Sequence, residues 1–295
     1  MSVHTAPKAE LDFSKPLTTV DMVQAKGKRS LTMVTAYDYS MAQLADQAGL
    51  DMLLVGDSLG MVMLGRKDTV SVTLDEMIHH CRAVVQGTKR ALLVGDMPFM
   101  TYETSVSDAL KNAARLCGEG GVRAVKLEGG HDVAPQVRAL VKAGIPVCGH
   151  LGLTPQRAAV LGGFKVQCKS AQAAQILVQD ALELQDAGCF AIVLEALPAP
   201  VAEIVTARLD IPTLGIGAGP HCDGQVLICH DMFGLYSNFQ PKFSKQYFNA
   251  GAAIREGFKT FVSEVAEKSF PAPEHCFTIK DEELQELKAL LGDKA

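Results

Sequence analysis

Charged side chains stand at the ends of short apolar segments along this chain. In the stretch LLVGDSLG, three apolar residues lead through Gly56 to Asp57 and Ser58, and a second Val-Gly pair leads to Asp96. Further members of the set follow later apolar segments: Lys126, Glu128, His150, Glu195, His230 and Asp231. Carboxylates, an ammonium and imidazoles are the groups that bind divalent cations and transfer protons.

Two of these carboxylates predict a metal site. Asp57 and Asp96 follow equivalent Val-Gly pairs on consecutive apolar segments. Neighbouring carboxylates repel each other unless a cation joins them, and all-oxygen ligands favour Mg²⁺. The competing interpretation is that an Asp after a strand forms a turn or caps a helix. That interpretation suits Asp38 and Asp231 better than it suits Asp57 and Asp96.

The other candidates leave alternatives open. Lys126 and Glu128 are two residues apart and so share one side of a strand, where they form either part of a site or a structural ion pair. His150 is either a site residue or a hydrogen-bonded core histidine. Glu195 follows an apolar tetrapeptide, and a carboxylate with reduced hydration there suits a general base. The Gly215–Gly219 stretch is a weak indication of a phosphate-binding loop.

The elements that must position these residues alternate regularly. Eight apolar segments with little polar alternation predict buried parallel strands: Leu31–Ala36, Met52–Val55, Ala91–Val94, Ala124–Leu127, Ile145–Gly149, Phe190–Leu194, Thr213–Ile216 and Leu227–Cys229. Helical patterns lie between and after them: Ser40–Ala48, Leu74–Gln86, Val106–Cys117, Ala134–Ala143, Ala171–Ala187, Val201–Ala207 and Lys245–Lys268. Gly219–Gln225 is expected to be a weak helix or a loop.

Eight such units predict an α/β fold, a (β/α)₈ TIM barrel, in preference to a doubly wound sheet. We expect residues 1–295 to form a single barrel domain, with an extended or flexible segment over 1–17 and an extra N-terminal helical segment. A tail over 271–295 is expected to carry a helix at Asp281–Leu291. In a barrel, side chains at the carboxyl ends of the strands meet on one rim.

Composition restricts the class of protein. The net charge of −5 gives no general attraction to nucleic acid or to anionic membranes. The chain has no apolar run approaching the ~18 residues of a spanning helix and no apparent signal peptide. Its eight cysteines form no C-x-x-C pair, which indicates reduced thiols and a cytoplasmic location.

At the rim residues the sequence resembles the ketopantoate hydroxymethyltransferase family. The resemblance is carried, in order along roughly residues 18–265, by these stretches: Thr35–Asp38, Val55–Gly60, Gly95–Phe99, Val125–Gly130, Gly149–Gln156, Glu195, Gly215–Gly219 and His230–Asp231. Each stretch alone is a weak signal, and together they are specific.

The resemblance implies an Mg²⁺-dependent barrel enzyme. Such an enzyme transfers a hydroxymethyl group from methylenetetrahydrofolate to α-ketoisovalerate, giving ketopantoate for pantothenate and coenzyme A biosynthesis. It also implies a cytoplasmic homo-oligomer, often of ten subunits. Carried over by motif, the metal ligands are Asp57, Asp96 and, directly or through water, Glu128; the general base is Glu195; the substrate-binding residues are Asp57, Ser58, Asp96, Lys126 and His150.

Two other functions fit the same rim. One is a related Mg²⁺-enolate barrel of the lyase or mutase type, which would be expected to show a catalytic Cys loop or more Arg at the mouth. The other is a non-catalytic assembly protein, which would be expected to have lost some of the rim carboxylates. Neither expectation matches the sequence.

Overall fold

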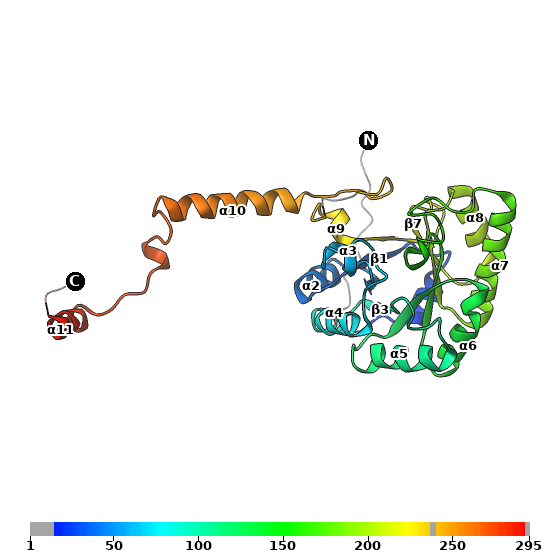
Figure 1. Ribbon diagram of the computed structural model, residues 1–295, viewed down its shortest axis with the longest axis horizontal. Helices are drawn as coiled ribbons and strands as arrows, with labels where there is room; N and C mark the ends of the chain where they lie inside the picture. The colour runs from blue at the N-terminus through cyan, green and yellow to red at the C-terminus, as the bar shows by residue number, and fades with distance from the viewer. Residues whose placement is uncertain (1–14, 237–239, 293–295) are drawn as a thin grey trace.

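A computed structural model describes residues 15–236 and 240–292, and in it eight parallel strands close into a barrel (Figure 1). Each strand pairs with the next along the chain, and the first pairs with the last. The strands are β1 (Leu31–Thr35), β2 (Met52–Val55), β3 (Leu92–Asp96), β4 (Ala124–Glu128), β5 (Val147–Gly152), β6 (Ala191–Glu195), β7 (Thr213–Ile216) and β8 (Gly224–Leu227). The predicted (β/α)₈ barrel is confirmed.

Helices surround the barrel and extend beyond it. The α-helices are α1 (Thr19–Ala25), α2 (Tyr39–Gln47), α3 (Leu59–Val62), α4 (Leu74–Gly87), α5 (Val106–Gly118), α6 (Ala134–Lys142), α7 (Ala171–Ala187), α8 (Ala199–Arg208), α9 (Cys229–Met232), α10 (Ala250–Ala266) and α11 (Asp281–Leu291). Three short 3₁₀ helices are η1 (His131–Val133), η2 (Pro155–Arg157) and η3 (Pro273–His275). Of the expected N-terminal segment, residues 1–14 lie outside the described part of the chain.

The barrel interior follows the two-residue alternation of the strands. In β4, Val125 and Leu127 pack outward against the helices, whereas Ala124 packs inward with Met52 and Leu92. The extra helix α1 closes the amino-terminal end of the barrel, where Met22 is fully buried in the same interior cluster. The lower half of the interior is therefore a packed apolar core that supports the opposite rim.

The same inward positions become charged at the carboxyl ends of the strands. In β4 the inward series Ala124, Lys126, Glu128 runs from apolar to charged, and in β3 it ends at Asp96. The strand register places Asp96 beside Lys126 and Glu128 beside His150. The period of two thus brings residues that are distant in sequence to one rim.

The last strand differs from its prediction. It spans Gly224–Leu227 instead of Leu227–Cys229, and His230 and Asp231 lie in the short helix α9. A Cβ atom at Gly224 would lie 2.5 Å from the Leu31 carbonyl oxygen, so glycine permits the close approach of β8 to β1. The end of the segment expected to be a weak helix or a loop is therefore the start of the strand.

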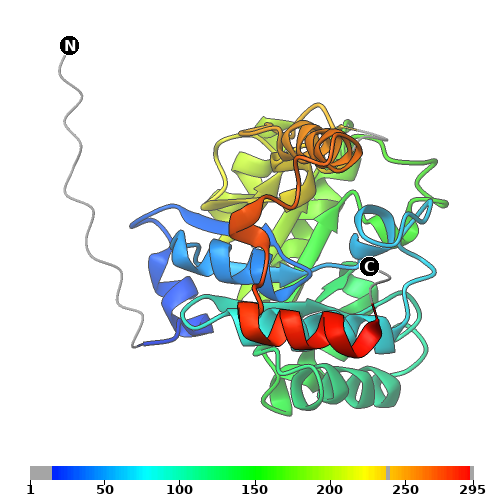
Figure 2. The same cartoon turned by 90° about the vertical axis from the view of Figure 1, so that its left-hand side faces the viewer.

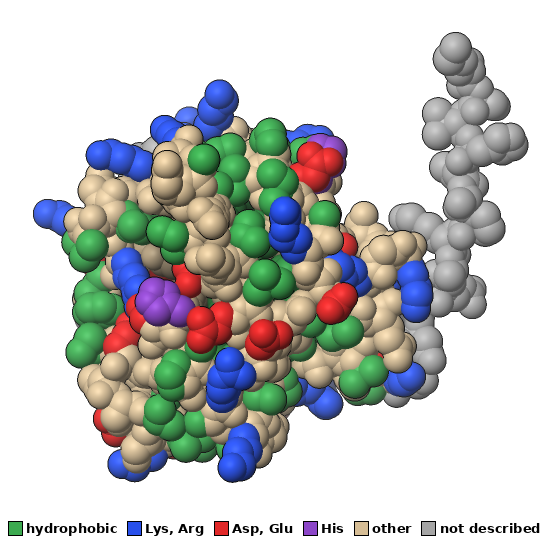
Figure 3. All heavy atoms as spheres, turned by 90° about the vertical axis from the view of Figure 1, so that its right-hand side faces the viewer, with side chains coloured by type: hydrophobic (Ala, Val, Ile, Leu, Met, Phe, Trp, Pro, Cys, Tyr) green, Lys and Arg blue, Asp and Glu red, His purple; other side chains and the backbone are tan. Residues whose placement is uncertain are grey.

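The chain after the barrel forms an extended arm. Helix α10 begins at Ala250, later than the predicted Lys245, because the Asn249 side chain caps it by accepting a hydrogen bond from the Ala252 backbone. Figure 1 shows α10 and α11 standing away from the barrel, and neither helix contains a buried residue. Figure 2 looks along this arm, so the two helices overlap the barrel in that view. On the opposite side of the molecule, Figure 1 shows the helices α6, α7 and α8, and the surface there mixes apolar and charged side chains (Figure 3). Within residues 15–236 and 240–292, no helix combines the length and apolar character needed to cross a membrane.

Candidate active site

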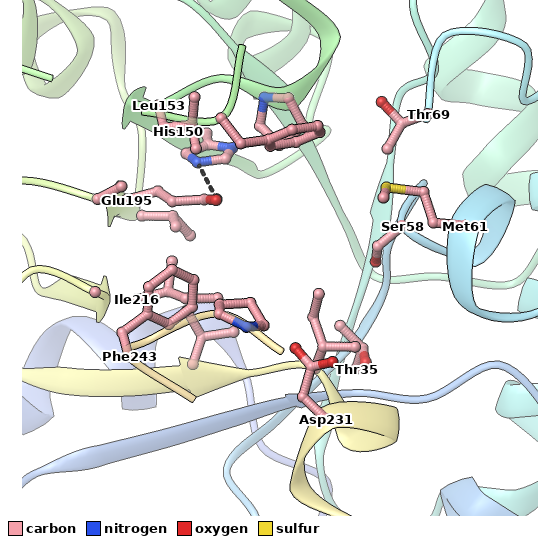
Figure 4. Close-up of a pocket in the computed structure, with 18 of the residues that line it drawn as sticks. Thr35, Ser58, Met61, Thr69, His150, Leu153, Glu195, Ile216, Asp231 and Phe243 are labelled. Carbon is pink, nitrogen blue, oxygen red and sulfur yellow. Dashed lines mark ion pairs between the residues drawn. The ribbon is translucent and has the colours of Figure 1, made fainter. Parts of the chain in front are cut away.

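A cavity of about 620 Å³ opens at the carboxyl ends of the strands (Figure 4). All seven residues that the sequence assigns to catalysis, substrate or metal line it: Asp57, Ser58, Asp96, Lys126, Glu128, His150 and Glu195. Figure 4 shows His150 and Glu195 on one wall, with Ser58, Met61 and Thr69 on the opposite wall. Cavities of this size bury ligands of drug-like dimensions.

Asp57 and Asp96 form the acidic centre of the cavity floor. Asp57 lies two residues after the last residue of β2, and its backbone N–H donates a 3.0 Å hydrogen bond to Oδ2 of Asp96 on the neighbouring strand. Burial, together with the charges of Asp96 and Glu128, raises the pKa of Asp57 well above its usual range. Burial also raises the pKa of Asp96, against the opposing effect of Lys126. The two carboxylates therefore favour a nearby cation.

Lys126 connects this acidic centre to the next strand. Its Nζ lies 2.9 Å from Oδ1 of Asp96 and 3.9 Å from Oε1 of Glu128. Burial lowers the pKa of Lys126, but the surrounding carboxylates outweigh that effect and raise it, so the side chain stays charged. Although Lys126 is close, Oδ1 of Asp96 has no aligned hydrogen bond among the described residues, so the contact is an ion pair only.

His150 lies between two carboxylates. Its Nδ1 is 3.3 Å from Oε1 of Glu128, and its Nε2 is 3.2 Å from Oε2 of Glu195 (Figure 4). Burial and the Lys126 charge lower the pKa of His150, but the two carboxylates raise it overall to about 9. This raised pKa favours the protonated ring, which suits a partner of Glu195 better than a base.

Glu128 is the most constrained of the carboxylates. Its Oε2 accepts a 3.0 Å hydrogen bond from the Gln156 backbone N–H, and its Oε1 faces His150 and Lys126. Burial raises the pKa of Glu128, but the hydrogen bond and charge of His150 outweigh it and the pKa is lowered. Because both oxygens already have partners, contact with a metal through water suits Glu128 better than direct coordination.

The residues present fit a divalent cation. The cluster combines four carboxylates with two cationic groups: Asp57, Asp96, Glu128 and Glu195 with Lys126 and His150. With the carboxyl groups ionised, two negative charges remain, which one Mg²⁺ would balance. Over the described ranges, however, no three His, Cys, Asp or Glu side chains converge as a complete ligand set. That arrangement matches Mg²⁺, which takes one or two carboxylates and fills its other positions with water and substrate oxygens.

Sequence reasoning assigned no role to Gln156, and the structure gives it a central position. Its side-chain Nε2 donates to Oδ2 of Asp57 at 2.8 Å and to the Met97 carbonyl at 3.0 Å. Its Oε1 accepts a 2.7 Å hydrogen bond from the hydroxyl of Tyr102, which is buried beneath Glu128. The Thr154–Gln156 stretch was part of the motif, but no sequence signal shows that its amide reaches Asp57.

The structure also places the two other aspartates, Asp38 and Asp231, and the glycine-rich stretch that follow predicted strands. Asp38 caps α2 by accepting a hydrogen bond from the Met41 backbone, as the alternative interpretation expected. Asp231 does not act as a turn former of that kind: it lines the cavity, and burial raises its pKa to about 6. Gly217 has φ +63°, and a Cβ there would lie 2.6 Å from the Phe243 ring, so this glycine permits close packing of an aromatic wall.

Comparison with known proteins places the chain in a family. The sequence profile described as ketopantoate hydroxymethyltransferase matches residues 16–273. A protein named 3-methyl-2-oxobutanoate hydroxymethyltransferase from Nitratidesulfovibrio vulgaris is 61% identical, covering 100% of this chain and 97% of the relative. A protein of the same name from Oleidesulfovibrio alaskensis is 59% identical, covering 96% of each chain.

Solved structures of lower identity show the same fold. A 2,3-dimethylmalate lyase, a member of the PEP mutase/isocitrate lyase superfamily, has a TM-score of 0.58 at 16% identity, covering 94% of this chain and 97% of its own. A phosphonopyruvate hydrolase in complex with oxalate and Mg²⁺ has a TM-score of 0.56 at 14% identity, covering 91% and 98%. From the profile match and the close relatives, we conclude that the chain belongs to the ketopantoate hydroxymethyltransferase family.

Proposed function

We propose that this protein is an Mg²⁺-dependent enzyme that transfers a hydroxymethyl group from methylenetetrahydrofolate to α-ketoisovalerate, giving ketopantoate. The single observation that carries the proposal is the paired arrangement of Asp57 and Asp96 beside Lys126, with Glu195 on the same rim. The close relatives named for this transfer support the choice of substrate.

In this proposal, some residues of the cavity bind the metal and the substrate, and others transfer the proton. Asp57 and Asp96 would hold the metal, which supplies Lewis-acid polarisation of the substrate carbonyl when bound. Lys126 and Ser58 would bind the keto acid carboxylate, and Ser58 is oriented by a 2.8 Å contact between its Oγ and the Tyr37 hydroxyl. The keto acid then presents its carbon next to the carbonyl to the wall that carries Glu195.

Glu195 would act as the general base. It would take the proton from the carbon next to the carbonyl, and that carbon would form a bond to the one-carbon unit. The bonds from this unit to the folate nitrogens break, water supplies the hydroxyl group, and the substrate proton and one proton of the water end on the nitrogens of tetrahydrofolate. His150, 3.2 Å from Oε2 of Glu195, orients the carboxylate and supplies a positive charge beside the reacting atoms. The folate provides the one-carbon chemistry that protein side chains lack.

Turnover with both substrates tests the proposal. Purified protein with Mg²⁺, α-ketoisovalerate and methylenetetrahydrofolate should form ketopantoate, detected by NMR or mass spectrometry. Replacing α-ketoisovalerate by phosphonopyruvate or 2,3-dimethylmalate tests the lyase and mutase chemistry of the structural neighbours. Reaction with either of these, and none with α-ketoisovalerate, would overturn the proposal.

Lys126→Ala separates a substrate-binding role from a purely structural ion pair. Because a buried ammonium binds carboxylates as a point charge, the variant should bind α-ketoisovalerate more weakly by about tenfold or more in calorimetry with Mg²⁺ present. The matched control is Lys111→Ala, which removes an exposed lysine paired with Asp108 on α5. An unchanged dissociation constant in a folded Lys126→Ala protein would favour the structural interpretation.

We also propose that the protein is a homo-oligomer, with ten subunits as the family resemblance implies. The arm supports an assembly because its helices expose apolar side chains and contain no buried residue. On α10, Phe258 and Val262 are each 67% exposed, and on α11, Leu290 is 76% exposed. An isolated amphipathic helix is only marginally stable without a packing partner.

Deletion of the chain from Asp281 onward should therefore reduce the subunit number or lower the melting temperature. Light scattering gives the mass, and calorimetry gives the melting temperature. Leu287→Ser with Leu290→Ser should act in the same direction, whereas Glu286→Ser on the same helix should leave both quantities unchanged. An unaltered mass and stability in the deleted protein would rule out a packing role for α11.

A further inference from the structure

The two carboxylate oxygens of Asp57 have different surroundings. Oδ2 accepts a 2.8 Å hydrogen bond from the side-chain amide of Gln156. Oδ1 has no hydrogen bond or ion pair with any residue of 15–236 or 240–292, and it is not among the unpartnered side-chain atoms that the protein encloses. Because Asp57 lines the cavity, Oδ1 is the oxygen that is available to a bound ion.

The Gln156 amide is held in one orientation. Its Nε2 carries two hydrogens, and two acceptors lie within reach, namely Oδ2 of Asp57 at 2.8 Å and the Met97 carbonyl at 3.0 Å. Its Oε1 accepts a 2.7 Å hydrogen bond from the Tyr102 hydroxyl. Exchanging the amide nitrogen and oxygen would set an oxygen against two acceptors. The neighbours therefore fix the N–H donor that faces Asp57.

Gln156 and Tyr102 lie behind the cavity wall. They are 4% and 0% exposed, and the described lining of the cavity includes neither of them. The Tyr102 hydroxyl also accepts a 3.2 Å hydrogen bond from the Glu128 backbone N–H, and the Gln156 backbone N–H donates to Oε2 of Glu128 at 3.0 Å. Gln156 is thus held by both its main chain and its side chain, and it can act on a ligand only through the carboxylates it contacts.

A carboxylate that offers one oxygen discriminates between divalent cations. Mg²⁺ requires a near-ideal octahedral arrangement and keeps several waters, whereas Ca²⁺ takes about six to eight oxygens and accepts a carboxylate through both of its oxygens. For Asp57 to bind through both oxygens, Oδ2 would have to leave Gln156. That movement would leave a buried N–H without its acceptor, which costs free energy. The buried amide therefore opposes the coordination that the larger ion favours.

We propose that Gln156 is a positioning residue that makes Asp57 a one-oxygen ligand and thereby selects Mg²⁺ over Ca²⁺, with Tyr102 fixing the amide. The inference rests on the proposed function, because it takes Asp57 as a metal ligand. It assigns the choice of ion to a side chain that lines neither the metal site nor the substrate cavity. Residues behind metal ligands commonly adjust metal affinity in this way.

Gln156→Met tests the amide, because it keeps the side-chain length, removes the donor and leaves the backbone N–H to Glu128 in place. Free and bound Mn²⁺ differ in their electron paramagnetic resonance signals, so displacement of Mn²⁺ from the substrate-free protein by Mg²⁺ and by Ca²⁺ measures both affinities without turnover. The ratio of Mg²⁺ to Ca²⁺ affinity should fall by about tenfold in the variant, the lower end of the usual effect of losing such a residue.

Gln136→Met is the matched control. Gln136 is also buried, at 8% exposure, and its amide donates to the Tyr102 carbonyl at 3.2 Å instead of to a carboxylate. This variant should keep the wild-type ratio of affinities. Tyr102→Phe is a second test, because it leaves Gln156 in place and removes the hydroxyl that holds its amide. The ratio should fall in the same direction as in Gln156→Met, but by less.

The outcomes separate this inference from the function on which it rests. Equal weakening of Mg²⁺ and Ca²⁺ binding in Gln156→Met would leave the ratio unchanged and overturn the inference, as would equal affinity of the wild type for the two ions. If Gln156→Met does not fold, an unchanged ratio in Tyr102→Phe would overturn it. A changed ratio in a protein that forms no ketopantoate would overturn the proposed function alone. Equal Mn²⁺ binding by wild type and Asp57→Asn would overturn both.

Discussion

Glu195→Gln should retain Mg²⁺ and keto acid binding while lowering kcat by about 10²–10⁴-fold, the usual effect of losing a general base. Glutamine has nearly the same size and can still accept a hydrogen bond from His150, but it cannot take the substrate proton. Steady-state turnover gives kcat, and calorimetry gives the two binding constants. Glu203→Gln on the exposed surface of α8 is the matched control and should keep wild-type values.

A wild-type kcat in the Glu195→Gln variant would show that another residue is the general base. His150 is the next candidate by position, since it contacts Glu195 directly. The neighbouring carboxylates raise the pKa of His150 to about 9, however, which favours the protonated ring and makes it a weaker candidate for the base. Loss of keto acid binding in a folded Glu195→Gln protein would instead assign Glu195 to substrate binding.

Asp57→Asn and Asp96→Asn should each weaken Mg²⁺ binding by more than about tenfold, with a parallel loss of turnover. The expectation follows from the loss of a ligand charge, since even residues behind the metal ligands commonly change affinity by 10–100-fold. Calorimetric titration of Mg²⁺ in the presence of α-ketoisovalerate measures the effect. Asp108→Asn, on the exposed surface of α5, is the control for a carboxylate outside the cavity. Full Mg²⁺ affinity in both site variants would refute the ligand assignment.

The rim was predictable because its residues lie at strand ends. The period of two along β4 and the register with β3 bring Lys126 to within 2.9 Å of Asp96, although the two residues are thirty positions apart. Strands with few polar residues and helices with clear caps, such as Thr73 paired with Glu76, were placed within a few residues of their observed bounds. Local pattern and barrel geometry together determine this part of the site.

The remaining site residues could not be predicted, because their roles depend on contacts between distant segments. The Gln156 amide reaches Asp57 from ninety-nine residues away, and nothing in its local sequence indicates that contact. The predicted start of β8 was wrong for a related reason. Gly224 begins the strand because β8 must approach Leu31 of β1 closely, and the two residues are far apart in the sequence.

For the arm, the sequence predicted the helix but not the surface against which it packs. The leucine spacing predicted a helix at Asp281–Leu291, and the structure has one with those bounds. Leucines at 284, 287, 290 and 291 give this helix an apolar face that needs a partner, but their spacing does not say whether the partner is the same barrel or another subunit. Within the described chain, α11 has no buried residue, so it is not packed against its own barrel. That observation supports the contact between subunits that we propose above.

Proton exchange without folate tests the central claim most directly, because it isolates the step assigned to the metal site and Glu195. Wild-type protein with Mg²⁺ and α-ketoisovalerate in deuterated water should exchange the proton next to the carbonyl, followed by NMR as loss of its signal. Chelation of Mg²⁺ should stop the exchange, and Glu195→Gln should exchange no faster than buffer containing Mg²⁺ alone. Exchange that persists at the wild-type rate in Glu195→Gln, or after complete chelation of the metal, would contradict the account.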